Sequence, residues 1–247
     1  MNYRSALRFP TSVVILTAGL STLCLAQSAK SRVTITHVKP EMLIEWVDLQ
    51  KNEVVPALKK AGIKTRTVYS SGLFGNSYEY VVVTPMEKFA DFDAGNPLVK
   101  ALGETASARL GEKLRKCTLS SQSFMSTRLD DLSNPSESSE PPPIITSTRL
   151  RIAPGKMPEF ESIVKTDVLP VFKKAKAPYT VLRRGLGANP NDVTITTPHG
   201  NWADLDAPAP FVKALGAEGA AKVLAKFTGV STVIETVART RAADLSF

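Results

Sequence analysis

The chain has 247 residues, a formal net charge of +8 and 43% hydrophobic residues, enough apolar material for two domains of ordinary size. Its lysines and arginines are scattered or paired, as in Lys59-Lys60 and Arg183-Arg184. They do not form the basic stripe with interleaved aromatic residues that nucleic-acid binding needs. Nucleic acid is therefore excluded as a partner, and the charge supports only a mild preference for anionic ligands.

Residues 1–26 have the pattern of a secretory signal peptide. Arg4 and Arg8 form a basic region, an uncharged apolar stretch follows at 13–26, and residues 24–26 fit a small-x-small cleavage site. The apolar stretch is shorter than the about 20 residues of a membrane span. We predict an exported protein, periplasmic or extracellular, without stable membrane insertion after cleavage. A leader that is retained as an anchor is the alternative.

The rest of the chain contains two similar segments. Pro97–Ser133 aligns without a gap onto Pro210–Ser246, and upstream Val55-Pro56 corresponds to Leu169-Pro170. A fixed internal period defines the folding unit. We predict one unit at 32–133 and a second at 145–247. The Pro/Ser/Glu-rich segment between them, 134–144, has the composition of an extended linker.

Each unit predicts the order strand, helix, strand, strand, helix, strand, which is the ferredoxin-like βαββαβ arrangement. Pro56 and Pro170 share a slot late in the first helix, where proline removes a backbone hydrogen bond and predicts a kink or an end to the regular helix. The expected strands are 33–38, 65–71, 77–84, 118–128, 146–152, 179–184, 192–197 and 231–241, and the expected helices are 41–60, 97–116, 156–175 and 210–227.

This element order, with the Val-x-Pro-x-x-Lys-Lys-Ala segment at 54–61, resembles the dimeric α/β-barrel superfamily, most closely its NIPSNAP-like and EthD-like branches. The resemblance implies an α+β fold in which two units pair their antiparallel sheets into a barrel. A tandem copy would build that barrel within one chain, as a pseudo-dimer. The superfamily includes cofactor-independent monooxygenases, haem-dependent peroxidases, chlorite-decomposing enzymes and proteins without an assigned activity, so the fold alone says little about function.

Comparison of the two units predicts which strand residues face the barrel interior. Positions that are apolar in both units mark the side that packs on the helices, and the alternate positions point the other way. This reasoning brings an imidazole, two guanidiniums and two carboxylates together inside the barrel: His37, Arg149, Arg151, Glu79 and Asp192.

These five residues are the candidate site. Arg149 and Arg151 could clamp a carboxylate or phosphate through charge-assisted hydrogen bonds, with Glu79 and Asp192 in the same ligand-binding set. His37 could transfer a proton and is the candidate catalytic residue. The alternative is that the carboxylates and guanidiniums pair with one another across the seam between the sheets.

No metal or cofactor is predicted, because the two histidines, His37 and His199, are far apart and no cluster has metal-ligand spacing. We expect a protein that binds a small anionic or amphipathic molecule in the barrel cavity. A cofactor-independent, monooxygenase-like oxidoreductase is the first alternative, and a structural or interaction module is the second. The sequence also allows a homodimer.

Overall fold

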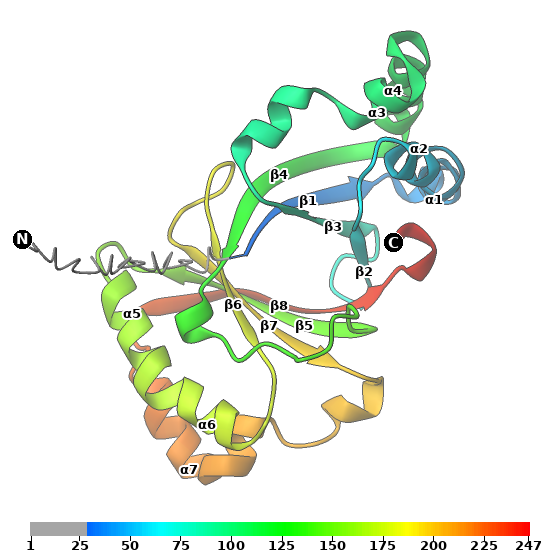
Figure 1. The fold of residues 1–247 in the computed structure, drawn as a ribbon. Helices are drawn as coiled ribbons and strands as arrows, with labels where there is room; N and C mark the ends of the chain where they lie inside the picture. The colour runs from blue at the N-terminus through cyan, green and yellow to red at the C-terminus, as the bar shows by residue number, and fades with distance from the viewer. Residues whose placement is uncertain (1–28) are drawn as a thin grey trace, which may run out of the picture.

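Eight antiparallel strands form a closed barrel in the order β1-β3-β2-β8-β5-β7-β6-β4 (Figure 1). The computed structural model describes residues 29–247, so the predicted signal peptide lies outside the described residues. The strands are β1 (Lys30–Val38), β2 (Thr67–Phe74), β3 (Glu79–Met86), β4 (Thr118–Arg128), β5 (Ile144–Ile152), β6 (Thr180–Arg184), β7 (Asp192–His199) and β8 (Ser231–Arg241).

Helices cover the outside of the barrel in two groups that lie on opposite sides of it (Figure 1). The first group is α1 (Leu43–Leu49), α2 (Val55–Lys60), α3 (Pro97–Leu102) and α4 (Glu104–Cys117), and the second is α5 (Met157–Ile163), α6 (Leu169–Lys174) and α7 (Pro210–Ala225). Short 3-10 turns stand at Pro40–Met42, Phe89–Ala94, Asp130–Leu132, Trp202–Leu205 and Ala243–Leu245. The prediction of an α+β fold with an antiparallel barrel is confirmed at this level. Within 29–247, no helix is long and apolar enough to cross a membrane.

The irregularity predicted at Pro56 and Pro170 takes the form of a π-bulge. π-Helical segments lie just before the prolines, at Gln50–Val54 and Val164–Val168. In each, the first residue after the segment donates its N–H to a carbonyl five residues back. Because proline has no N–H to donate, one wider turn absorbs the missing bond and the helix continues into α2 or α6.

A glycine with positive φ interrupts the later helix of each half. Gly103 (φ 80°) separates α3 from α4, and Gly216 (φ 71°) breaks the helical geometry inside α7. Glycine adopts this conformation without the steric cost that a Cβ brings. The prediction of a single helix over 97–116 is therefore wrong, because this segment forms two helices. The helix predicted over 210–227 changes direction at Gly216.

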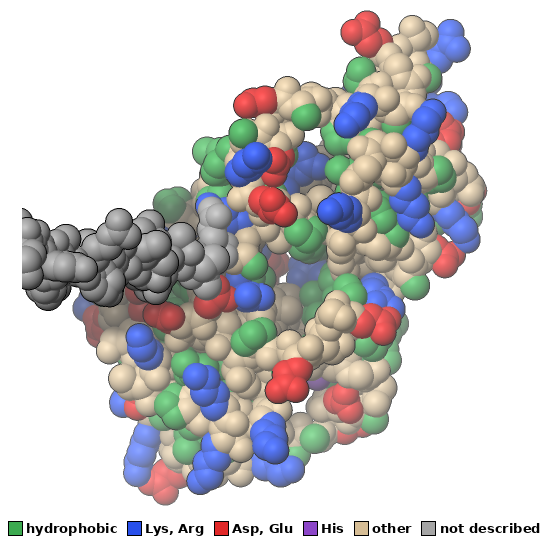
Figure 2. All heavy atoms as spheres, viewed as in Figure 1, with side chains coloured by type: hydrophobic (Ala, Val, Ile, Leu, Met, Phe, Trp, Pro, Cys, Tyr) green, Lys and Arg blue, Asp and Glu red, His purple; other side chains and the backbone are tan. Residues whose placement is uncertain are grey.

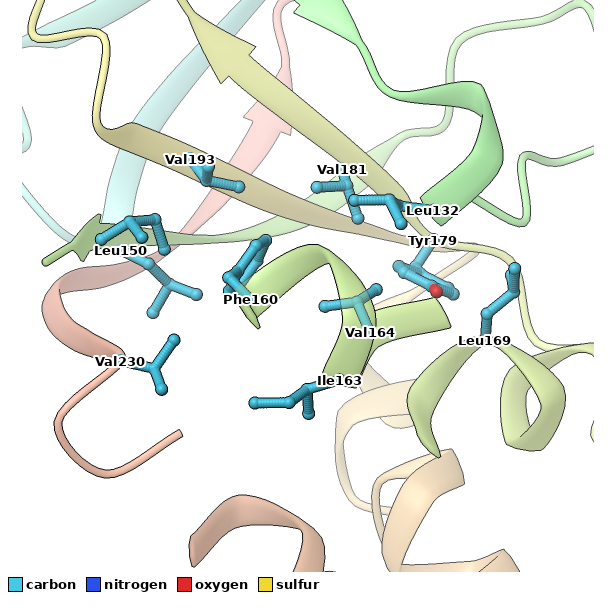
Figure 3. Packing of buried hydrophobic residues seen from close by; sticks show 11 residues of the cluster. Leu132, Leu150, Phe160, Ile163, Val164, Leu169, Tyr179, Val181, Val193 and Val230 are labelled. Atoms are coloured by element: carbon cyan, nitrogen blue, oxygen red, sulfur yellow. The ribbon is translucent and has the colours of Figure 1, made fainter. Parts of the chain in front are cut away.

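Each helix group packs on the outer face of the strands beside it, and these two cores fix which strand residues point inward. Figure 3 shows the second core, which joins strand residues such as Leu150 and Val193 to helix residues such as Phe160 and Val164. The first core is built in the same way around Val38, Trp46, Leu49, Val54, Val68, Leu110, Cys117 and Leu245. The residues that alternate with these strand positions point into the barrel.

Candidate functional site

The five residues singled out from the sequence lie in two clusters at the barrel end where β1 and β5 finish and β3 and β7 begin. His37 on β1 stands opposite Glu79 on β3, and Arg151 on β5 stands opposite Asp192 on β7. The structure therefore brings His37 together with Glu79, and both arginines together with Asp192. No ion pair among residues 29–247 joins the two clusters directly.

Asp192 is the centre of the second-half cluster and is fully buried. Its Oδ2 accepts hydrogen bonds from Arg149 Nε (3.0 Å) and Nη2 (2.7 Å), and its Oδ1 accepts from Arg151 Nε. Burial alone would raise the pKa of Asp192, but the bonds from Arg151 and Arg149 hold it below its ordinary value. One ionised carboxylate thus anchors both guanidiniums, whose side chains remain 28% and 41% exposed.

Glu79 is the centre of the first-half cluster. Its Oε1 accepts hydrogen bonds from Arg239 Nη2 (2.7 Å) and Ser71 Oγ (3.0 Å), and its Oε2 lies 3.3 Å from His37 Nε2. The other ring nitrogen of the histidine, Nδ1, lies 3.0 Å from Ser120 Oγ. Burial opposes ionisation of Glu79, but the bonds from Arg239 outweigh it and hold the pKa of the carboxyl below its ordinary value.

A cavity of about 260 Å³ lies inside the barrel, and strands from both halves contribute to its wall. Most of the wall is apolar, with two buried arginines, Arg184 and Arg239. Of the residues described, the five singled out from the sequence are not among those that line it. The apolar wall residues include Val33, Ile35, Val81, Val83, Phe124, Ile145 and Leu182.

Arg184 is one of the two charged residues of this cavity wall. It is only 8% exposed, its Nε donates to Thr194 Oγ1 (3.2 Å), and its guanidinium lies 4.6 Å from the ring centroid of Phe124. Burial lowers its pKa to about 10, so it is charged at neutral pH. Arg239 has Glu79 as its counter-ion, whereas no carboxylate of residues 29–247 forms an ion pair with Arg184.

The segment 134–144 is hydrogen-bonded to side chains of β2 and β8 and contributes Ser136 and Pro142 to the cavity wall. Tyr69 Oη donates to the carbonyl of Pro142 (3.2 Å), and Arg241 Nη1 donates to the carbonyl of Pro141 (2.6 Å). The segment predicted as a linker therefore also closes part of the cavity.

Sequence reasoning missed Arg184, Arg239 and Ser120. Comparison of the two halves does not flag the arginines, because serine occupies the matching position in each case: Ser71 for Arg184 and Ser126 for Arg239. The usable signal is strand alternation, since Arg184 follows the cavity residue Leu182 by two positions.

A second cavity, of about 580 Å³, lies between the strands and helices of the second half and is lined by residues such as Leu150, Phe172 and Phe211. Haem, which the resemblance implies for some superfamily members, would find no imidazole or thiolate among the described residues that line it. His199 lies elsewhere and contacts Thr146 Oγ1 through Nε2 (3.0 Å). The described residues also contain no group of three His, Cys, Asp or Glu that could hold a metal ion. This cavity therefore does not fit a haem held by histidine or cysteine.

No protein-family model and no curated protein matches the chain. Solved structures, in contrast, do match this chain. An anthrone oxidase-like protein matches with a TM-score of 0.55 and 13% identity over 88% of this chain and 92% of its own. The chlorite dismutase of Candidatus Nitrospira defluvii matches with a TM-score of 0.53 and 11% identity over 89% and 94%. A provisionally assigned monooxygenase of Fusobacterium nucleatum subsp. nucleatum matches with a TM-score of 0.53 and 11% identity over 88% of this chain and 93% of its own. At such identities the likeness concerns the fold alone: this chain has the dimeric α/β-barrel fold of monooxygenase-like and chlorite dismutase proteins.

Proposed function

We propose that this protein binds a small molecule that carries an anionic group on an apolar body, inside the barrel. The observation that carries the proposal is Arg184, a buried guanidinium that faces an apolar cavity and forms no ion pair within residues 29–247. A buried charge without a counter-ion is costly. An anionic ligand would supply the missing counter-charge.

The cavity suits a ligand of modest size. Its volume of about 260 Å³ lies just below the range of about 300–1,000 Å³ that is usual for drug-sized ligands. A carboxylate could accept hydrogen bonds from the two Nη groups of Arg184, whose Nε is already bonded to Thr194. The ligand body would pack against the valines and Phe124 of the wall.

The residues first singled out have a supporting role in this proposal. Glu79 fixes Arg239 at the cavity wall, and Asp192 fixes Arg149 and Arg151. Because the outer parts of these last two arginines are exposed, they would meet a ligand only if it extends from the cavity to the end of the barrel.

We also propose that the barrel arose by tandem duplication of a ferredoxin-like unit in the NIPSNAP-like or EthD-like branch, and that the chain is exported. The repeated register supports the duplication: Thr67 lies opposite Val83 as Thr180 lies opposite Thr196, and Ser70 opposite Thr240 as Arg183 lies opposite Thr127. Export rests on the sequence pattern of residues 1–26.

Calorimetry with octanoate and octanol tests the binding proposal, because the two molecules share an apolar chain and differ in charge. Octanoate should bind the wild type, and Arg184→Met should weaken it about 10- to 100-fold, the value of a lost hydrogen bond to a charged group. Arg183→Met is the matched control, since Arg183 is the exposed neighbour and should bind octanoate as the wild type does. Equal affinity for octanol, or unchanged octanoate binding in Arg184→Met, would contradict the proposal.

The second candidate is a cofactor-independent oxidoreductase in which His37 takes a proton from the substrate. The names of the similar structures favour it, as does the contact of His37 with the ionised Glu79. Dioxygen uptake with a phenolic substrate, lost in His37→Ala at unchanged melting temperature, would support this candidate.

A further inference from the structure

We infer that Ser120, His37 and Glu79 form a nucleophile–base–carboxylate set that can accept an acyl group from a small ester. The three residues lie on the adjacent strands β4, β1 and β3, where His37 stands opposite Ser120 on one side and opposite Glu79 on the other. Paired strands hold such a set more rigidly than loops do. The inference does not depend on the proposed ligand, because the set is not part of the cavity wall described above.

The distances and the chemistry of the carboxylate define which nitrogen carries the proton in the neutral imidazole of His37. Glu79 is ionised and can only accept hydrogen bonds, so the nitrogen that faces it, Nε2 at 3.3 Å, carries the proton. Nδ1 then has a free lone pair and lies 3.0 Å from Ser120 Oγ. This is the tautomer that a general base needs in order to take a proton from serine, and such contacts often tighten only when substrate is bound.

Glu79 is itself held in place by groups outside the set. Arg239 donates through Nη2 at 2.7 Å and Ser71 through Oγ at 3.0 Å, both to Oε1. This leaves Oε2 for the histidine. A serine, a base within reach of it, and a third group that orients the base are the recurring signature of an activated nucleophile, and it is recognised by geometry rather than by position in the sequence.

Two other serines of the strand, Ser121 and Ser123, lack this environment. Ser121 Oγ lies 3.4 Å from Thr36 Oγ1, and Ser123 Oγ lies 2.8 Å from Thr34 Oγ1. A threonine hydroxyl is not a base at neutral pH, so neither neighbour is activated. Ser120 is exposed and the His37 side chain is 32% exposed, so a small ester can reach both from solvent.

The reaction balances without a further reagent. Ser120 Oγ attacks the ester carbonyl carbon while His37 Nδ1 takes the hydroxyl proton. The bond from the carbonyl carbon to the alkoxide oxygen breaks, and the alkoxide leaves with the proton that the histidine returns. Water then attacks the acyl-serine, gives its proton to His37, and the proton passes to Ser120 Oγ as the acid leaves.

The test is the full chain with para-nitrophenyl acetate, an ester whose leaving group needs little assistance. We expect release of para-nitrophenolate together with an acetyl group located on Ser120 by peptide mapping. Ser120→Ala should remove that acetyl group, and His37→Gln should slow acetylation at this position by about 100-fold, the usual contribution of a general base. Ser121→Ala is the control on the same strand and should react as the wild type does.

Two results would overturn the inference: acetyl groups found on lysines but not on Ser120, or Ser120 acetylation at the same rate in His37→Gln. A matched melting temperature for each variant excludes loss of fold as the cause. Arg184→Met separates this inference from the proposed function, because it should lose octanoate binding and keep the acetylation of Ser120.

Discussion

The two halves of the barrel, residues 29–133 and 134–247, share the same strand pairing but carry different side chains at matched positions. In the first half His37 stands between Glu79 and Ser120, and in the second half Arg151 stands between Asp192 and Thr232. A guanidinium stays charged at every physiological pH, whereas an imidazole gains and loses a proton. The same strand positions therefore hold a permanently charged guanidinium in one half and, in the other, the imidazole for which we propose proton transfer.

Arg66 in the first half and Tyr179 in the second half are a second pair of matched positions, under the helices. Arg66 exchanges two backbone hydrogen bonds with Phe247, just as Tyr179 does with Asn134. The buried guanidinium of Arg66 donates to Gln50 Oε1 (2.7 Å) and to the carbonyl of Leu245 (2.9 Å). The Oη of Tyr179 is buried too, but it has no hydrogen-bond partner among the described residues. The first half satisfies its buried polar group and the second half does not.

The largest effect should come from Glu79→Gln. Its partner Arg239 has only 8% of its side chain exposed, so loss of the carboxylate leaves a buried charge without a counter-ion. We expect a loss of about 3 kcal/mol in the free energy of unfolding. Asp192→Asn should cost less, about 1–2 kcal/mol, because Arg149 and Arg151 can turn to solvent. Urea unfolding measures both, and the reverse order would contradict the different roles assigned to the two clusters.

Acid should destabilise the protein through the same two carboxyls. Their pKa values in the folded state lie below the ordinary 4.5 and 3.8. The stabilisation that the two ionised carboxylates provide is therefore fully present above those ordinary values. It is lost as the pH falls through the folded-state pKa values. The contribution of these two carboxyls to the free energy of unfolding should therefore be level between pH 7 and about pH 5 and then fall, by at most about 1.4 kcal/mol per pH unit for each carboxyl. His199 adds a separate loss of stability as the pH falls from 7, because burial lowers its pKa below the ordinary 6.5.

Asp192→Asn sharpens this measurement because it removes one of the two titrating groups. Its stability should fall less steeply below pH 5 than that of the wild type, in urea titrations at matched ionic strength. An unchanged slope would mean that Asp192 keeps an ordinary pKa in the folded protein, and hence that its bonds to the arginines are weak.

The sequence predicted the parts of this fold that depend on local composition. The strands expected at 118–128 and 231–241 agree with β4 and β8 to the residue, because residues that favour strands are a local signal. An irregularity at Pro56 and Pro170 was predicted but not its form as a π-bulge, and the break at Gly103 was not predicted. The break and the π-bulges depend on a backbone angle and on competition between hydrogen bonds, which residue patterns record only weakly.

The site was harder to predict because its key contacts join distant segments. Strand alternation suggested that His37 and Glu79 share the barrel interior, but Arg239 reaches Glu79 only because β8 of the second half pairs with β2 of the first. Arg184 became a candidate only when the barrel closed over it and left it without a carboxylate. Strand alternation could place Arg184 in the barrel interior, but neither its lack of a carboxylate partner nor the pairing of β8 with β2 is visible in residue type or spacing.

The smallest effect we expect, and the one of opposite sign, concerns Tyr179. Figure 3 shows its ring within the second core, where it packs against Phe172 at a centroid distance of 4.5 Å. Tyr179→Phe keeps this packing and removes a buried hydroxyl without a partner, so it should raise the free energy of unfolding by about 0.5–1 kcal/mol. Tyr69→Phe is the matched control. The hydroxyl of Tyr69 donates to Pro142, and its loss should cost about 1 kcal/mol. If Tyr179→Phe is as costly as Tyr69→Phe, the hydroxyl of Tyr179 bonds a water or ligand in solution, and the contrast with Arg66 disappears.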